Sequence, residues 1–156
     1  MLLALKALHI LSAALFFGTG LGSAWYKLRA GLQSDLAVIA WVDAEVVRAD
    51  WIFTIPSGLL LPLTGLGMVH LLHLPLSTPW IAWALGGYGI AGLTWLPAAA
   101  LQLRMRRLSA AARDAQSPLP AAWTRAQLQW ALLGIPSFLA AASTIWVMVT
   151  KQIPFQ

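Results

Sequence analysis

The chain has no cysteine among its 156 residues. Without thiols it cannot form a disulfide, a thiolate metal site or an iron–sulfur cluster, and it cannot attach a haem through thioether bonds. Charged residues are also scarce, at 10% of the chain, whereas soluble domains usually carry about a quarter. Hydrophobic residues make up 60%. This composition excludes an ordinary soluble domain and indicates an integral membrane protein.

Three stretches of the sequence contain no Asp, Glu, Lys or Arg, namely residues 7–26, 51–103 and 126–150. A helix needs about 20 apolar residues to cross a bilayer, so the first and third stretches each supply one span. The middle stretch is long enough for two spans joined by a short turn at 73–79. We therefore predict an all-α integral membrane four-helix bundle, a single domain over residues 1–156, with antiparallel up-down topology. The predicted helices cover about 3–26, 50–72, 80–103 and 126–150.

The three connections between these spans have different patterns. The turn before Pro79 is uncharged, and residues 104–125, with five arginines, read as a polar connection. In residues 27–50, apolar side chains recur at near-helical spacing after Asp35. This pattern predicts a short cytoplasmic amphipathic helix that lies on the membrane or leads directly into the second span. Arg48 and Asp50, at the mouth of that span, are expected to make surface or headgroup contacts.

The distribution of Lys and Arg predicts the orientation. Eight of the ten basic residues fall in the two long connections: Lys27, Arg29, Arg48, Arg104, Arg106, Arg107, Arg113 and Arg125. Because cytoplasmic loops are enriched in Lys and Arg, both termini are expected outside, on the periplasmic side of the bacterial cytoplasmic (inner) membrane. The same bias explains the net charge of +5 without a nucleic-acid partner. We expect the lipid bilayer to be the main partner that the protein contacts.

All three histidines are predicted to lie near the outer face. His9 follows Lys6 by one turn inside the first span, and His70 and His73 end the antiparallel second span. An ionisable side chain inside a membrane is costly and tends to be functional. The shared location of these histidines therefore predicts a ligand site.

Two histidines on facing helices of a bundle can hold a b-type haem, since imidazole is a good axial ligand and the bundle core is dry. We predict His9 and His70 as the axial pair to the haem iron, with His73 as the alternative second ligand. Lys6 would lie beside a haem propionate, and Phe16 and Phe17 would form the wall.

Other interpretations of the same residues stay open. Three histidines also suit copper or zinc, although no carboxylate lies on that side of the membrane. There is no Ser–His–Asp arrangement and no HExxH motif, so no catalytic residue can be named. As a haem protein the chain would exchange electrons with a quinone or a redox partner protein. Alternatively it is a non-catalytic membrane subunit or scaffold, in which Gly18, Gly22 and the glycines at 86–89 provide helix contacts, including contacts in a homo-oligomer.

Four motifs together resemble a family of small bacterial four-helix integral membrane proteins of unknown function. They are LKALHI at residues 5–10, the glycine cluster at 18–22, VRAD at 47–50 and Met148-Val149-Thr150-Lys151 after the last span. The resemblance covers nearly the whole chain and implies the four-helix topology.

The chain is also similar, more distantly, to the HemJ-type protoporphyrinogen oxidases. The similarity covers the LKALHI pattern, the Phe16–Phe17 pair and the Pro56–Gly65 stretch. It implies a haem-related role for His9 alone. This chain has Ala84 where those proteins have a lysine, and its third span has no histidine. A second haem ligand would therefore have to come from the second span, from His70 or His73.

Overall fold

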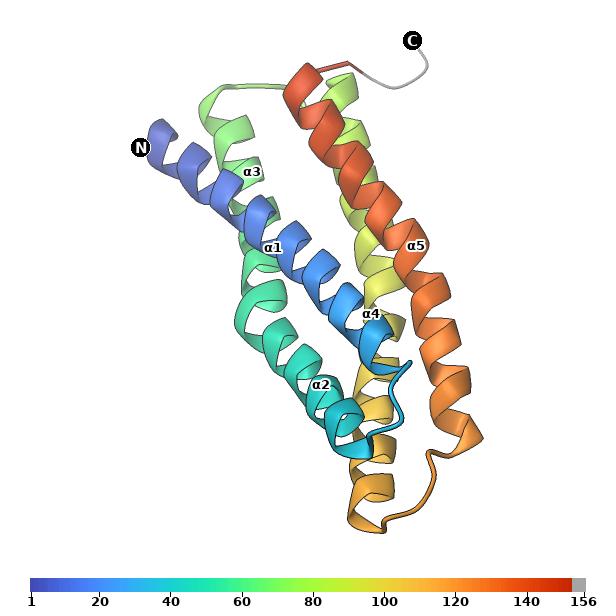
Figure 1. Cartoon of the computed structure of the whole chain (residues 1–156). Helices are drawn as coiled ribbons and strands as arrows, with labels where there is room; N and C mark the ends of the chain where they lie inside the picture. The colour runs from blue at the N-terminus through green and yellow to red at the C-terminus, as the bar shows by residue number, and fades with distance from the viewer. Residues whose placement is uncertain (153–156) are drawn as a thin grey trace.

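The computed structural model describes residues 1–152, which form a bundle of long helices with no strand in that range (Figure 1). The elements are α1 (Leu2–Ala30), α2 (Leu36–Ala49), the π-helical turn η1 (Asp50–Thr54), α3 (Ile55–Leu71), α4 (Pro79–Asp114) and α5 (Ala121–Thr150). Because α2, η1 and α3 are continuous, they form one long helix. Each of the four resulting helices is long and apolar enough to cross a membrane. This confirms the all-helical membrane-protein fold class.

Consecutive long helices alternate in direction (Figure 1). We call the end that carries the 31–35 and 115–120 connections the loop end. The end where α1 begins, α5 ends and the 72–78 turn lies is the terminal end.

The helices extend further than the charge-free stretches. α4 continues past residue 103 to Asp114, so the prediction of a polar connection over all of 104–125 was wrong for its first half. Arginine favours helix, and here Arg104, Arg106 and Arg107 are exposed while other side chains of α4 face the bundle. The inward side chains recur at helical spacing: Ala98, Gln102, Met105, Ser109 and Ala112.

The segment before the second span leads directly into it. Asp35 caps α2, since its side chain accepts a hydrogen bond from the Ala37 backbone N–H at 2.8 Å. At η1 the backbone N–H of Ile55 donates to the Asp50 carbonyl five residues earlier. The next residue is Pro56, which has no N–H to donate to a carbonyl four residues back. A π turn is thus placed where the regular α-helical pattern is interrupted.

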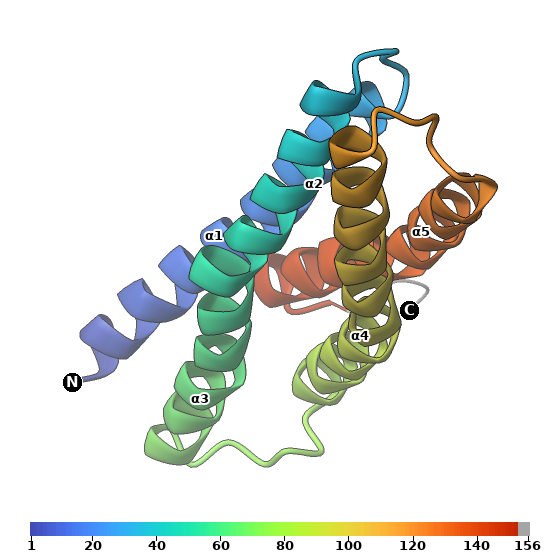
Figure 2. The same ribbon diagram turned by 90° about the horizontal axis from the view of Figure 1, so that it is seen from below.

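The packing of the helices differs between the two ends. α4 lies along α5, α1 packs on α3, and α2 contacts both α1 and α4. Among the described residues the backbones of α3 and α4 do not come close to each other. Figure 2 shows the terminal parts of α1 and α3 on one side and α4 with α5 on the other. The bundle is therefore closed at the loop end and open at the terminal end.

A buried ion pair lies inside the closed end. Lys27 of α1 and Asp43 of α2 are 1% and 2% exposed, and the Lys27 ammonium donates to Asp43 Oδ1. The other carboxylate oxygen accepts hydrogen bonds from Ser109 Oγ of α4 at 2.8 Å and from Trp123 Nε1 of α5 at 2.7 Å. The Lys27 ammonium also lies 5.6 Å from the centroid of the Trp130 ring. This one polar cluster joins all four long helices.

We expect Lys27→Met to lower the free energy of unfolding by about 3–5 kcal/mol, because it leaves the Asp43 charge buried without its cation. The double substitution of Lys27 to Met and Asp43 to Leu should recover part of this loss. Unfolding of the detergent-purified protein by a denaturant titration measures both changes.

The matched control is Arg48→Gln, which breaks the solvent-exposed pair with Glu45. That change should stay within about 1 kcal/mol. Equal effects at the two pairs would contradict the structural role of the buried one.

Candidate functional site

A cavity of about 760 Å³ lies at the terminal end, between the α1–α3 pair and the α4–α5 pair. This volume is within the range of small-molecule and cofactor sites, about 300–1,000 Å³. All four long helices contribute to its largely apolar lining. The polar or titratable side chains in the lining are Lys6, His9, Tyr88, Thr144 and Lys151.

Aromatic side chains form the deep part of this cavity. The Tyr88 hydroxyl of α4 donates to the Gly58 carbonyl of α3 at 2.9 Å, which ties the two helix pairs together below the cavity. Phe16 and Phe17, predicted to form the wall of a ligand site, both line it. The Phe17 ring stacks on Phe138 of α5 with centroids 4.8 Å apart. The cavity is thus bounded toward the loop end.

His9 lies in the cavity wall with its ring orientation fixed by Thr64 of α3. The distance from His9 Nδ1 to Thr64 Oγ1 is 2.8 Å. Assigning the Thr64 proton to the Leu60 carbonyl, 2.6 Å from its hydroxyl, makes the Thr64 oxygen the acceptor of the Nδ1 proton. In that assignment the neutral imidazole carries its proton on Nδ1 and keeps the lone pair on Nε2 for a ligand.

Gly65 makes room for this imidazole. A methyl group at Gly65 would lie 3.2 Å from His9 Cε1. The glycine lets α3 approach α1 while the ring stays in the cavity wall.

Two lysines lie at the end of the cavity that is nearer the chain termini. Lys151 ends α5 in the left-handed conformation, with φ at 58°, and its ammonium lies 3.7 Å from the centroid of the Trp80 ring. Partial burial, and to a smaller extent the neighbouring Lys6 ammonium, lowers the pKa of Lys151 below its usual value. Neither aspartate nor glutamate lines the cavity. Its outer end is therefore suited to an anionic group.

The other two histidines lie at the same end but outside the cavity. His70 shares the exposed face of α3 with Leu59 and Leu63, and His73 is exposed in the turn after α3 with φ at 50°. Neither lines the cavity. Within residues 1–152 no cluster of three or more His, Cys, Asp or Glu side chains is placed to hold a metal ion. The structure brings Lys6 and His9 into one site and leaves His70 and His73 apart from it.

Sequence reasoning missed Thr64, Tyr88 and Lys151 as site residues. Lys151 entered only the count of charges, and Thr64 and Tyr88 are uncharged side chains in apolar spans. The register of two antiparallel helices could have paired residue 9 with residues near 64, but the rotation of α3 about its axis was not known.

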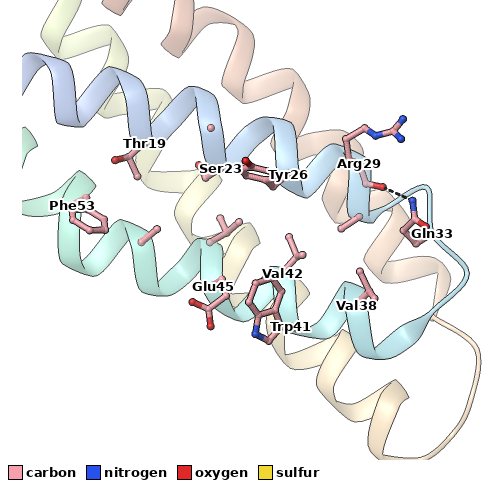
Figure 3. A pocket seen from close by; sticks show the side chains of 14 residues that line it. Thr19, Ser23, Tyr26, Arg29, Gln33, Val38, Trp41, Val42, Glu45 and Phe53 are labelled. Carbon is pink, nitrogen blue, oxygen red and sulfur yellow. Dashed lines mark hydrogen bonds between the residues drawn. The ribbon is translucent and has the colours of Figure 1, made fainter.

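A second hollow, of about 590 Å³, lies between α1 and α2 near the loop end (Figure 3). Its lining is mainly apolar and includes Trp41 and Phe53, together with Arg29 and Glu45. The Gln33 side-chain amide closes one end by donating to the Arg29 carbonyl at 3.4 Å. No histidine lines this groove.

A family model described as "Predicted integral membrane protein (DUF2269)" matches residues 3–152. No curated protein and no solved structure matches the chain. The resemblance to HemJ-type oxidases therefore rests only on the motifs described above.

We expect Thr64→Val to release the His9 imidazole, because the substitution removes the acceptor for its Nδ1 proton. Nitrogen NMR of labelled histidine should show the His9 ring as a single Nδ1-protonated tautomer in the unmodified protein. In the variant the His9 ring should be a mixture of tautomers. The control is Thr94→Val, since the Thr94 hydroxyl bonds only carbonyls of its own helix. An unchanged tautomer in Thr64→Val would contradict the assignment.

Proposed function

The chain belongs to this family of integral membrane proteins, and from that premise we propose that it binds a b-type haem in the terminal-end cavity and acts as a redox protein of the bacterial inner membrane. The observation that carries the proposal is His9, whose Nε2 lone pair is free and whose ring lies in the wall of a cofactor-sized apolar cavity. Eight of the ten Lys and Arg residues lie toward the loop end, which supports placing this cavity at the outer face.

The residues of the cavity fit a haem in three respects. Its volume and apolar lining suit a macrocycle. The hydrogen bond to Thr64 holds the His9 imidazole in one tautomer and strengthens it as a ligand. Lys6 and Lys151 can neutralise the two propionates, which the acid-free lining would otherwise leave without partners.

A bound haem would supply one-electron chemistry, and a quinone or a redox protein at the outer face would be the exchanging partner. The residues of the chain itself would bind the haem and orient it. Thr64 fixes the ligand ring, Phe16 and Phe17 exclude water, and Tyr88 closes the inner side of the cavity.

If a haem binds, a second protein ligand to its iron would have to come from a residue that lines the cavity. The exposed His70 and His73 do not line the cavity, whereas Met68 and Met148 do. Thioether is a known partner of histidine at haem iron. The proposal therefore assigns His9 as the ligand that the cavity supplies and does not depend on a bis-histidine pair.

Absorption spectra of the protein purified in detergent, after expression with ample haem, test this proposal. We expect a Soret band and a sharp reduced α-band in the unmodified protein, and loss of both in His9→Ala. Because His70 and His73 lie outside the cavity, their replacement by Ala should leave the spectrum unchanged.

Two outcomes would change the proposal. A protein without colour, and without haem uptake in a titration, would overturn it. Loss of the α-band in His70→Ala with a correctly folded protein would restore the bis-histidine pair predicted from sequence.

We expect Lys6→Gln and Lys151→Gln each to weaken haem binding by roughly 10-fold, because a hydrogen bond to a charged group contributes about 1.5–3 kcal/mol. Titration of the apo-protein with haem measures the affinity. Haem dimethyl ester, which has no free propionates, should bind to both variants with the same affinity as to the unmodified protein. Arg125→Gln at the loop end is the matched control, and an equal loss there would contradict a local role for the two lysines.

A second candidate function is that of a non-catalytic subunit or scaffold. The glycine cluster of α1 favours it, since a methyl group added at Gly18, Gly20 or Gly22 would meet no other atom within 4 Å. The same is true of Gly86 and Gly89 on α4. These faces are not used for packing inside the bundle and remain available to another transmembrane helix.

A further inference from the structure

Asp50 is a second buried carboxylate, and its surroundings differ from those of Asp43. The residue is 7% exposed, and its Oδ1 accepts a hydrogen bond from the Thr54 hydroxyl at 2.8 Å. Its Oδ2 is buried and has no hydrogen-bond partner within residues 1–152. The neutral Gln102 side chain, from α4, approaches the same carboxyl group but makes no hydrogen bond of good geometry to Oδ2. The expectation that Asp50 makes surface or headgroup contacts was therefore wrong.

The two aspartates provide an internal comparison. Asp43 has a cation, an indole N–H and a hydroxyl directed at its two oxygens. Asp50 has no cation and leaves one oxygen without a donor. An ionised carboxylate is very costly in a buried site unless it is paired and fully hydrogen-bonded. Asp43 meets that condition in the ionised form, and Asp50 does not.

The charged groups on the neighbouring elements are already paired or face outward. Lys27 of α1 is engaged with Asp43, and on α2 the exposed Arg48 pairs with Glu45. α3 carries no charged side chain, and its one histidine, His70, is at the far end. On α4 the charged residue closest in sequence to Gln102 is Arg104, which is exposed. None of these groups supplies a counter-ion to Asp50.

The backbone at this position is also unusual. Asp50 opens the π turn η1, in which the Ile55 N–H bonds the Asp50 carbonyl. Single π turns inside helices occur frequently at functional sites. Ionisable groups inside membrane bundles are commonly part of proton pathways.

We propose that Asp50 is a proton-binding site in the interior of the bundle, in which the side-chain carboxyl holds a proton at neutral pH. The step is a proton transfer from hydronium to Asp50 Oδ2: one O–H bond of the hydronium breaks, one O–H bond to Oδ2 forms, the carboxylate becomes neutral and a water molecule is left. Thr54 and Gln102 are the polar groups that contact the site. The proposal concerns the loop half of the bundle and does not rest on haem binding.

Infrared difference spectroscopy of the full-length protein in detergent tests this directly. At neutral pH the unmodified protein should show the carbonyl stretch of a protonated carboxylic acid, and Asp50→Asn should lack it entirely. The matched control is Asp114→Asn, an exposed aspartate paired with Arg113, which should leave the band unchanged. Absence of the band from the unmodified protein, or its persistence in Asp50→Asn, would overturn the proposal.

A second measurement uses only the unmodified chain and so does not depend on whether Asp50→Asn folds. Dicyclohexylcarbodiimide is an apolar reagent that adds to a protonated carboxyl group and rearranges to a stable N-acylurea without a leaving group. Mass spectrometry should find the adduct on Asp50 and not on the buried, ion-paired Asp43, with labelling that falls as the pH rises. Equal labelling of both aspartates would count against the proposal. Because neither readout involves the cavity, a failure here is distinguishable from a failure of haem binding.

Discussion

The buried ion pair between Lys27 and Asp43 is the contact on which the arrangement of the bundle depends. It draws one side chain from α1 and one from α2, and the Asp43 carboxylate takes further hydrogen bonds from α4 and α5. In an apolar environment such a cluster has few alternative partners, so it favours a single register of the four helices. The apolar residues Ile39, Met105 and Trp123 pack around it. The buried polar cluster and the closely packed apolar residues thus lie in the same half of the molecule.

Within residues 1–152 the opposite half has no comparable contact. α1 stays with α3 and α4 stays with α5, while α3 and α4 do not come close in the described chain. The Tyr88–Gly58 hydrogen bond is where the two pairs are joined on the inner side of the cavity. The cavity is therefore a consequence of tight association at one end and divergence at the other. A ligand bound there would replace the helix contacts that this half lacks.

The three titratable side chains of interest are distinguished by their hydrogen-bond partners. His9 bonds the Thr64 hydroxyl through Nδ1, and its ring lies in the wall of a cavity. Asp43 is saturated by donors and serves the architecture. Asp50 is undersaturated and is the group for which a proton is the simplest missing partner. Burial alone would not have separated these roles, because the aspartates are both nearly inaccessible.

The amino-acid sequence by itself determined the number of spans and the ends at which the histidines lie. The charge-free stretches indicate which segments can enter a bilayer, because the free energy of transferring a segment from water into lipid depends on its composition. For the same reason the sequence placed His9, His70 and His73 at one end correctly. It did not reveal that Lys27 and Asp43 form a buried pair, that Asp50 is buried, or that His9 faces a cavity while His70 lies beside exposed Leu63. Those outcomes depend on the rotation of each helix about its axis and on its partner across the bundle. Only the tertiary structure decides them, because the environment of a side chain is set by residues far away in the chain. The partners of Asp43, for example, are 16 to 80 positions from it.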